Sequence, residues 1–347
     1  MFAYIVRRIL ATIPVMIVVA LFVFALLHLS PGDPAAIIAG DTATPSDIAR
    51  IRAALGLDEP IYIQFGEWAW RLLHGDLGIS IFTNLPVSKL IEQRVEPTIA
   101  LTVATLIVSV LTAIPMGVLA AWRAGSWIDR SVMLFAVLGF SVPVFVLAYL
   151  LIYFFSMGGW YSICDWLVQW LAGPLGLPYA AWQALHLDQV AAKLSLPVQG
   201  YVSITRGFWP FLSHIILPSI ALGMIYAALI ARITRASMLD VLAQDYIRTA
   251  QAKGLANEQV LIGHALKNAA VPIVTIIGIG IALLISGVVV TETVFAIPGL
   301  GRLTVDAILR RDYPIIQGII LIFSAAYVLI NLLVDLSYTL LDPRIRY

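Results

Sequence analysis

Long apolar runs limit the folds open to this chain more than any other feature. The first extends from about Ile9 to Leu29, directly after Arg7 and Arg8, and comparable runs recur along the sequence. A helix of about 20 residues, rising about 1.5 Å per residue, crosses a hydrocarbon core of about 30 Å. Only 12% of the 347 residues are charged, against about 25% in soluble domains. We therefore predict an all-α integral membrane protein, one domain over residues 1–347, with six spans at about residues 9–29, 97–121, 132–156, 213–235, 269–291 and 315–340.

Basic residues near the ends of these runs predict the orientation of the spans. Arg7, Arg123, Arg232 and Arg344 lie at the ends that would share one side of the membrane. Because cytoplasmic loops carry an excess of Lys and Arg, we expect that side, and both chain ends, to be cytoplasmic. The first run exceeds the roughly 7–15 apolar residues of a signal peptide, so we expect it to remain as a span.

Two long segments then lie outside the cytoplasm, at residues 30–96 and 157–212. Both are rich in aromatic residues, which suit a membrane–water interface or a packed cap. A shorter outer loop contains Arg310 and Arg311, and these two arginines are an exception to the expected excess of Lys and Arg on the cytoplasmic side. The single cysteine, Cys164, excludes an intrachain disulfide.

A polar segment at residues 237–268 separates the fourth and fifth spans and is unusually long for so apolar a chain. Its pattern predicts two short helices joined at Gly254, a residue free to adopt a left-handed turn. In the first helix Leu239, Ala243, Tyr246 and Ala250 share one face. Such a two-faced element could dock on a soluble partner or lie on lipid headgroups, and an ordinary connecting loop is the alternative.

The second predicted helix of the polar segment carries an apolar stripe of Leu255, Ile262 and Leu266. We expect this stripe to be buried, either against the chain's own spans or against a partner. The opposite side carries Asn257 and His264, which would remain available to a docking groove.

Residues for catalysis or nucleotide binding do not occur in recognisable patterns. Glycine precedes none of the four lysines, so no G-x-x-x-x-G-K-[ST] phosphate loop is present, and neither H-E-x-x-H nor G-x-S-x-G occurs. The formal net charge of +1 gives no reason to expect a nucleic-acid partner. We expect a non-catalytic chain with no cofactor or metal of its own, powered by another polypeptide if it is a pump.

Few ionisable residues lie deep in the spans, which argues against an ion-coupled carrier. Glu292 lies near the outer end of the fifth span and Asp335 in the inner part of the sixth. Each is either part of a transport pathway or a structural carboxylate that reaches an interface or accepts backbone donors. Pro143 lies within the third span, where a proline can kink a helix that moves or lines a path.

Several motifs resemble those of permeases of bacterial dipeptide and oligopeptide importers. In the polar segment Arg248-Thr249-Ala250-x-x-x-Gly254 fits the E-A-A-x-x-x-G frame of ABC-transporter membrane subunits, except that Arg248 replaces the acidic residue. A salt bridge that the first glutamate of this frame makes in other ABC-transporter membrane subunits is therefore not expected in this chain. The longer motifs, in chain order, are IVRRIL, LSPGDP, LGLDEP, HGDLGIS, DYIRTAQAKGL, HALKNA, TETVFAIPGLGR, RRDYP and LLDPRIRY.

The resemblance implies a type I ABC importer permease fold in a bacterial inner membrane. Its implied partners are a second homologous permease, two ATPase subunits that hold ATP and Mg, an extracytoplasmic solute-binding protein and a peptide substrate. The polar segment would couple to the ATPases through Tyr246, Arg248, Ala250, Gly254, Leu255, Asn257, Glu258, Ile262, His264 and Leu266. Pro143 and Glu292 are the candidates for the pathway or its gate.

Two alternatives stay open at this point. Importers of glutathione and of nickel chelates share this permease type, so the cargo could be either. From another class, a stand-alone secondary transporter, channel or membrane enzyme would need no ATPase, and its polar segment would have no coupling role.

Overall fold

The chain is helical in the computed structural model, which describes residues 2–29, 33, 35–36, 44–54, 56–156, 158–159, 162–163, 165–166, 170 and 195–341. Cys164, Arg344 and parts of both outer segments lie outside these residues. Contacts divide the chain into two compact units, Met1–Glu96 with Arg302–Tyr347 (unit 1) and Pro97–Gly301 (unit 2). No strand occurs among the described residues, where a single isolated bridge pairs Ile79 with Pro86.

Five helices of the described chain are long and apolar enough to cross a membrane. Each covers one predicted span and extends beyond it, because the flanking polar residues continue the same hydrogen-bonded helix. The five are α1 (Phe2–Leu29), α5 (Val87–Trp122), α11 (Phe208–Leu242), α13 (Lys267–Val294) and α15 (Tyr313–Leu341).

The third predicted span, at 132–156, is not one continuous helix. The structure instead has α6 (Trp127–Ser141) and α7 (Val144–Phe155), bent by 103° at the break between them. Pro143 lies at the break, where its ring removes one backbone donor and favours an extended residue before it. Val142 is extended accordingly, with φ −84° and ψ 122°. The chain has six spans only if the bent pair makes a single crossing.

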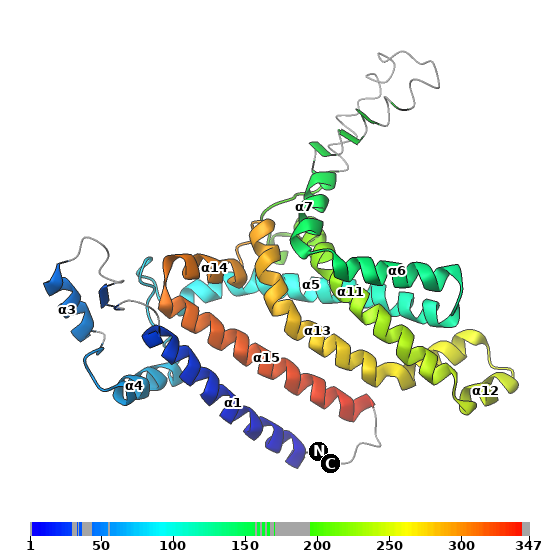
Figure 1. The fold of residues 1–347 in the computed structure, drawn as a ribbon, viewed down its shortest axis with the longest axis horizontal. Coiled ribbons are helices and arrows are strands. Elements are labelled where there is room, and N and C mark those ends of the chain that lie inside the picture. Colours follow the sequence, from blue (N-terminus) through cyan, green and yellow to red (C-terminus); the bar gives the residue numbers. More distant parts are fainter. Residues whose placement is uncertain are drawn as a thin grey trace. The chain divides into compact units, whose positions relative to one another are not determined.

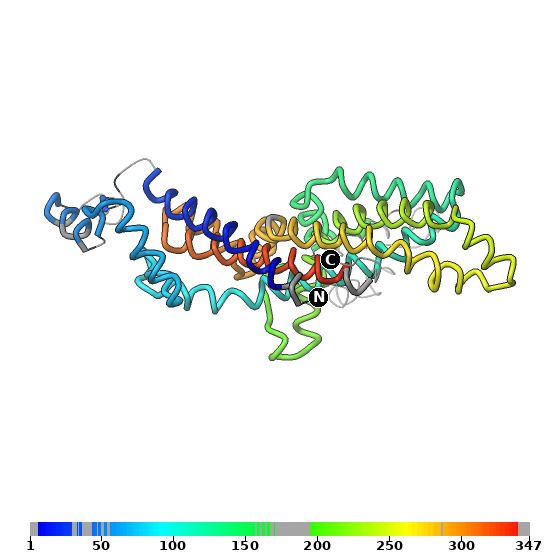
Figure 2. Tube along the Cα trace, turned by 90° about the horizontal axis from the view of Figure 1, so that it is seen from below, coloured from blue at the N-terminus to red at the C-terminus, as the bar shows by residue number. Residues whose placement is uncertain are grey.

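Unit 1 contains the antiparallel pair α1 and α15, which run side by side in Figures 1 and 2. Arg8 forms an ion pair with Asp335 near one end, and the Gln317 amide donates a 3.1 Å hydrogen bond to the Val23 carbonyl near the other. Asp335 is therefore a structural carboxylate that joins two helices. The unit also contains α3 (Pro45–Ala54), α4 (Ile61–Leu73) and most of α14 (Leu300–Arg310).

Unit 2 is organised around α11, the most buried of the five long helices. It packs against α13, α6 and α7, with Leu222, Tyr226 and Ile230 in the shared apolar core. Small residues allow close approach, because a Cβ added at Gly117 of α5 would lie 2.6 Å from the Cβ of Thr234 in α11. This tight packing lets a displacement of α11 move its neighbours.

Candidate functional site

The polar segment begins as the end of α11 and finishes as the start of α13. Between them lie α12 (Asp245–Ala252) and η2 (Gln259–Leu266), a π-helix that runs without interruption into α13. The second predicted helix is therefore a direct extension of the fifth span, and not a separate element. Figures 1 and 2 show α12 beyond the ends of α11 and α13, which lie side by side.

Gly254 ends α12 with a Schellman motif. Its φ is +77°, its N–H donates to the Gln251 carbonyl at 2.9 Å, and the Leu255 N–H donates to the Ala250 carbonyl at 3.3 Å. A Cβ added at Gly254 would meet no atom within 4 Å. Backbone conformation, and not space, is therefore what requires glycine here.

One face of α12 is anchored to the helices of unit 2. Ile247 and Ala250 are buried there, in a cluster with Ala121 of α5 and Met238 of α11. The predicted common face of Leu239, Ala243, Tyr246 and Ala250 is wrong, because the extended backbone of Gln244 (ψ 148°) separates the end of α11 from α12. Tyr246 itself is exposed.

The face of η2 also differs from the predicted stripe. Its buried residues are Val260, Leu261 and Ala265, while Leu266 is partly buried against the same cluster. In a π-helix, hydrogen bonds join residues five apart, so 260 with 265 and 261 with 266 share the inner side. Ile262 is 65% exposed, so of the two predicted alternatives for this residue, burial against the chain's own spans does not hold and burial against a partner stays a prediction.

The outer surface of the polar segment combines polar and apolar groups. Tyr246, Arg248, Asn257, Glu258 and Ile262 are exposed, whereas His264 and Leu255 are half-buried. Arg248 lies 3.4 Å from Asp245, but both side chains are largely in solvent, so this pair adds little stability. The surface is thus available to a partner, and the layer beneath it is packed.

A bidentate ion pair supports the base of this site and was not expected from the sequence. Arg235 of α11 donates from Nε to Asp129 Oδ1 at 2.5 Å and from a terminal nitrogen to Oδ2 at 2.7 Å. Asp129 is buried in the first turn of α6 and also accepts the Gly125 N–H at 2.9 Å. The sequence signal was Ser126, whose side chain caps α6 three residues before Asp129.

Glu292, one of the two pathway candidates, is buried in unit 2 with a relative exposure of 0%. The Thr98 hydroxyl donates to its Oε1 at 2.5 Å, and the Thr98 oxygen accepts the Leu300 N–H at 2.8 Å. A Cβ added at Gly299 would lie 2.0 Å from Oε1. The carboxylate therefore packs beneath the turn that leads into α14. Pro143, the other candidate, lies exposed at the α6–α7 break.

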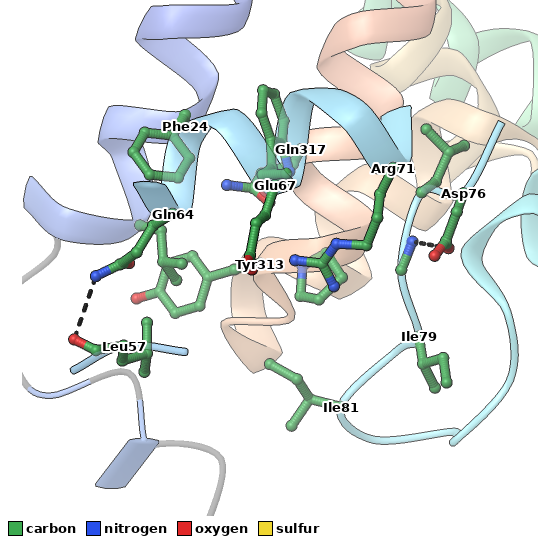
Figure 3. Close-up of a pocket in the computed structure, with 15 residues that line it drawn as sticks. Phe24, Leu57, Gln64, Glu67, Arg71, Asp76, Ile79, Ile81, Tyr313 and Gln317 are labelled. Carbon is green, nitrogen blue, oxygen red and sulfur yellow. Dashed lines mark hydrogen bonds between the residues drawn. The ribbon is translucent and has the colours of Figure 1, made fainter. Parts of the chain in front are cut away.

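A cavity of about 350 Å³ occurs in unit 1, between α1, α4 and the start of α15. Figure 3 shows Glu67 and Arg71 reaching from α4 toward Tyr313, while Gln64 donates to the Leu57 carbonyl at 3.2 Å. Phe24 and Trp68 contribute to its mostly apolar wall. In the described part of the chain, no group of three or more His, Cys, Asp or Glu side chains could hold a metal ion.

Comparison with known proteins identifies the family. Residues 113–347 match the family described as binding-protein-dependent transport system inner membrane component, and residues 1–102 match the N-terminal region of such components. The chain belongs to this family. It is an inner-membrane permease subunit of an ABC importer, and the expectation of an all-α type I permease is confirmed.

Two relatives cover nearly the whole permease. A protein of Sinorhizobium fredii named "probable peptide ABC transporter permease protein" is 52% identical over 344 residues, which cover 99% of each chain. The dipeptide transport system permease protein DppB of Escherichia coli is 40% identical over 355 residues, which cover 100% of this chain and 99% of the relative. The similarity therefore includes both compact units.

Proposed function

We propose that this permease forms half of the translocation pathway of an ATP-driven importer of short peptides. A second permease would form the other half, two ATPase subunits would supply the energy, and an extracytoplasmic binding protein would deliver the peptide. The peptide-transport names of relatives that match nearly the whole chain support this cargo.

One observation supports coupling through the polar segment more than any other. Its inner face shares an apolar cluster with α5, α11 and α13, whereas its outer face is exposed. A partner that pushed on the outer face would move α12 together with Met238 and Ile273, which belong to two different long helices. We propose that the ATPases dock there, and that this movement switches access between the two sides of the membrane.

Ile262 is the residue best placed to anchor the ATPase. An exposed aliphatic side chain in a mostly polar surface gains free energy when a partner buries it. Replacing it should not disturb the fold, because the side chain is already 65% exposed. Exposed Asn257 and Glu258 would surround this anchor and add hydrogen bonds at its rim.

The test compares Ile262→Ser with Trp127→Ser in the assembled importer. Trp127 is exposed at the start of α6, outside the polar segment, and serves as the control. We expect Ile262→Ser to lower co-purification of the ATPase and peptide uptake at least severalfold with normal membrane insertion, and Trp127→Ser to change neither. Equal ATPase recovery from Ile262→Ser and the unaltered chain would contradict the proposed docking.

Cargo and energy source are tested separately. Thermal shift of the paired binding protein should respond to a dipeptide, whereas a response only to glutathione or to a nickel chelate would replace the proposed cargo. Transport by the reconstituted chain alone, driven by an ion gradient, would instead favour a stand-alone transporter.

A further inference from the structure

Arg310 and Arg311 lie in a short loop on the predicted outer side, where the excess of Lys and Arg in cytoplasmic loops gives no reason for them. The coupling proposal does not give them a role either. Arg310 is the last residue of α14, and Arg311 lies in the turn that leads to the start of α15 at Tyr313. Both side chains are exposed, and neither has a hydrogen bond or an ion pair with any other described residue. Two adjacent positive charges are thus left free beside a membrane-spanning helix.

Apolar side chains are exposed directly beside these arginines. Leu303 and Ala307 bury one side of α14, while Ile308 is 56% and Leu309 is 78% exposed. Leaving two aliphatic side chains in water is unfavourable relative to burying them. The end of α14 therefore presents an apolar pair and a cationic pair together, which is the pattern of a helix that lies in a membrane interface.

The turn after α14 holds this group at the end of the span. Asp312 is buried, accepts the Ser80 hydroxyl at 2.6 Å and accepts the Ile81 N–H at 3.3 Å. Arg311 adopts a left-handed conformation with φ +56°, so the chain reverses sharply before Tyr313. The position of the arginines is consequently fixed relative to α15, whose apolar residues such as Leu329 are exposed along its length.

We propose that Ile308, Leu309, Arg310 and Arg311 form a binding surface for anionic phospholipid headgroups. The guanidinium groups would donate to lipid phosphates, for which their planar fork is well suited. Ile308 and Leu309 would enter the bilayer just below the headgroups. With the orientation proposed above, the lipids belong to the outer leaflet, but the surface itself does not depend on the cargo or on the ATPases.

A comparable arrangement in unit 2 supports the inference independently. Arg206 is exposed two residues before the start of α11, and Phe208 and Trp209, the first residues of α11, are also exposed. Aromatic and basic side chains are the usual anchors of spans at the headgroup level. Each unit thus places exposed cationic and apolar side chains together at the start of a long apolar helix.

The first test measures membrane depth at Leu309. A nitroxide label is attached to Leu309→Cys in the full chain, with Cys164 replaced by Ser, in nanodiscs. We expect the label to collide more with oxygen, which dissolves in lipid, than with a water-soluble paramagnetic complex. Leu329→Cys on α15 provides the reference for a lipid-exposed site. A fully aqueous signal at position 309 would overturn the proposal.

The second test measures retention of phosphatidylglycerol by native mass spectrometry of the full chain from nanodiscs of phosphatidylcholine with and without that lipid. Arg310→Gln with Arg311→Gln should weaken retention by about fivefold per arginine, since each basic residue contributes about 1 kcal/mol at an anionic surface. Arg310→Lys with Arg311→Lys keeps the charge and should retain most of the lipid. Unchanged retention by the glutamine variant, with loss of binding-protein docking instead, would assign the arginines to a protein partner.

Discussion

Glu292 and Gly299 are so close in unit 2 that neither position tolerates a different side chain easily. The carboxylate has no exposed surface, accepts the Thr98 hydroxyl at 2.5 Å and faces the glycine across the turn. A buried carboxylate that lost its donors would be left desolvated and uncompensated. These contacts make Glu292 a structural residue that holds the C-terminal end of α13 against the start of α14 and Thr98 of α5.

Gly299→Ala should destabilise the permease, because the new methyl group would lie 2.0 Å from Glu292 Oε1. We expect a loss of about 1–3 kcal/mol, the usual cost of overpacking. Thermal unfolding in detergent measures the effect. Gly66→Ala is the control, since a Cβ at Gly66 in α4 would meet no atom within 4 Å. Equal stability of the two variants would show that the turn yields without cost.

At the scale of helices, the apolar cluster under α12 and η2 connects the polar segment to α5, α11 and α13. The ion pair between Asp129 and Arg235 joins α6 to α11 just before that segment begins. The π-helical geometry of η2 places Val260 and Ala265 on the same inner side and leaves Ile262 outside. Packing and helix type together thus decide which residues a partner can reach.

Asp129→Asn should separate α6 from α11, because Arg235 would then lose its counter-charge in a mostly buried pair. The expected loss is about 3 kcal/mol, near the lower end for a broken buried pair because Arg235 is partly exposed. Thermal unfolding of the single variants and of Asp129→Asn with Arg235→Gln forms a double-mutant cycle.

The control for this ion pair is Asp245→Asn, which breaks the exposed pair between Asp245 and Arg248. Exposed pairs contribute about 0–1 kcal/mol, so this variant should unfold almost like the unaltered chain. Additive effects in the Asp129–Arg235 cycle would mean that the two side chains do not stabilise each other.

Gly254→Val should strain the turn between α12 and η2, since φ is +77° and β-branched residues rarely adopt such a value. We expect ATP hydrolysis to continue while peptide uptake falls severalfold, because the segment would no longer hold its two parts at a fixed angle. Gly254→Asn is the matched control, as asparagine tolerates the left-handed region. If the valine and asparagine variants took up peptide equally at equal expression, the proposed role of the Gly254 turn in coupling would be contradicted.

At the scale of the whole molecule, the number of crossings depends on one broken helix. If α6 and α7 together cross the membrane once, six crossings leave both chain ends on the same side; if they form a re-entrant loop, five crossings leave the ends on opposite sides. The arginines near both ends favour the first arrangement.

Reporter fusions determine whether the number of membrane crossings is even or odd. A fluorescent protein that matures only in the cytoplasm, fused in turn to each end of the full chain, should fluoresce in both cases. The physical reason is that Arg7, Arg8, Arg344 and Arg346 are retained on the cytoplasmic side. Fluorescence from only one fusion would establish an odd number of crossings and identify the α6–α7 pair as re-entrant.

Much of the architecture could be predicted because hydrophobic length is a local property. Apolar runs of about 20 residues predict spans whatever surrounds them, and the turn at Gly254 follows from a residue type that favours left-handed backbone. The buried faces of the polar segment could not be predicted in the same way. Tyr246 and Ile262 were assigned from an unbroken helical period, whereas Gln244 interrupts that period and η2 changes it.

The sequence by itself determined the class of protein, the positions of most spans, the polar segment and the absence of recognisable catalytic patterns. Tertiary structure decided that Asp129 pairs with Arg235, that Glu292 packs beneath Gly299, and that the third predicted span breaks at Pro143. The physical reason is the separation along the sequence of the residues that determine each feature. Membrane insertion depends on the summed hydropathy of neighbouring residues, whereas these contacts join positions up to 106 residues apart or depend on how a kinked helix packs.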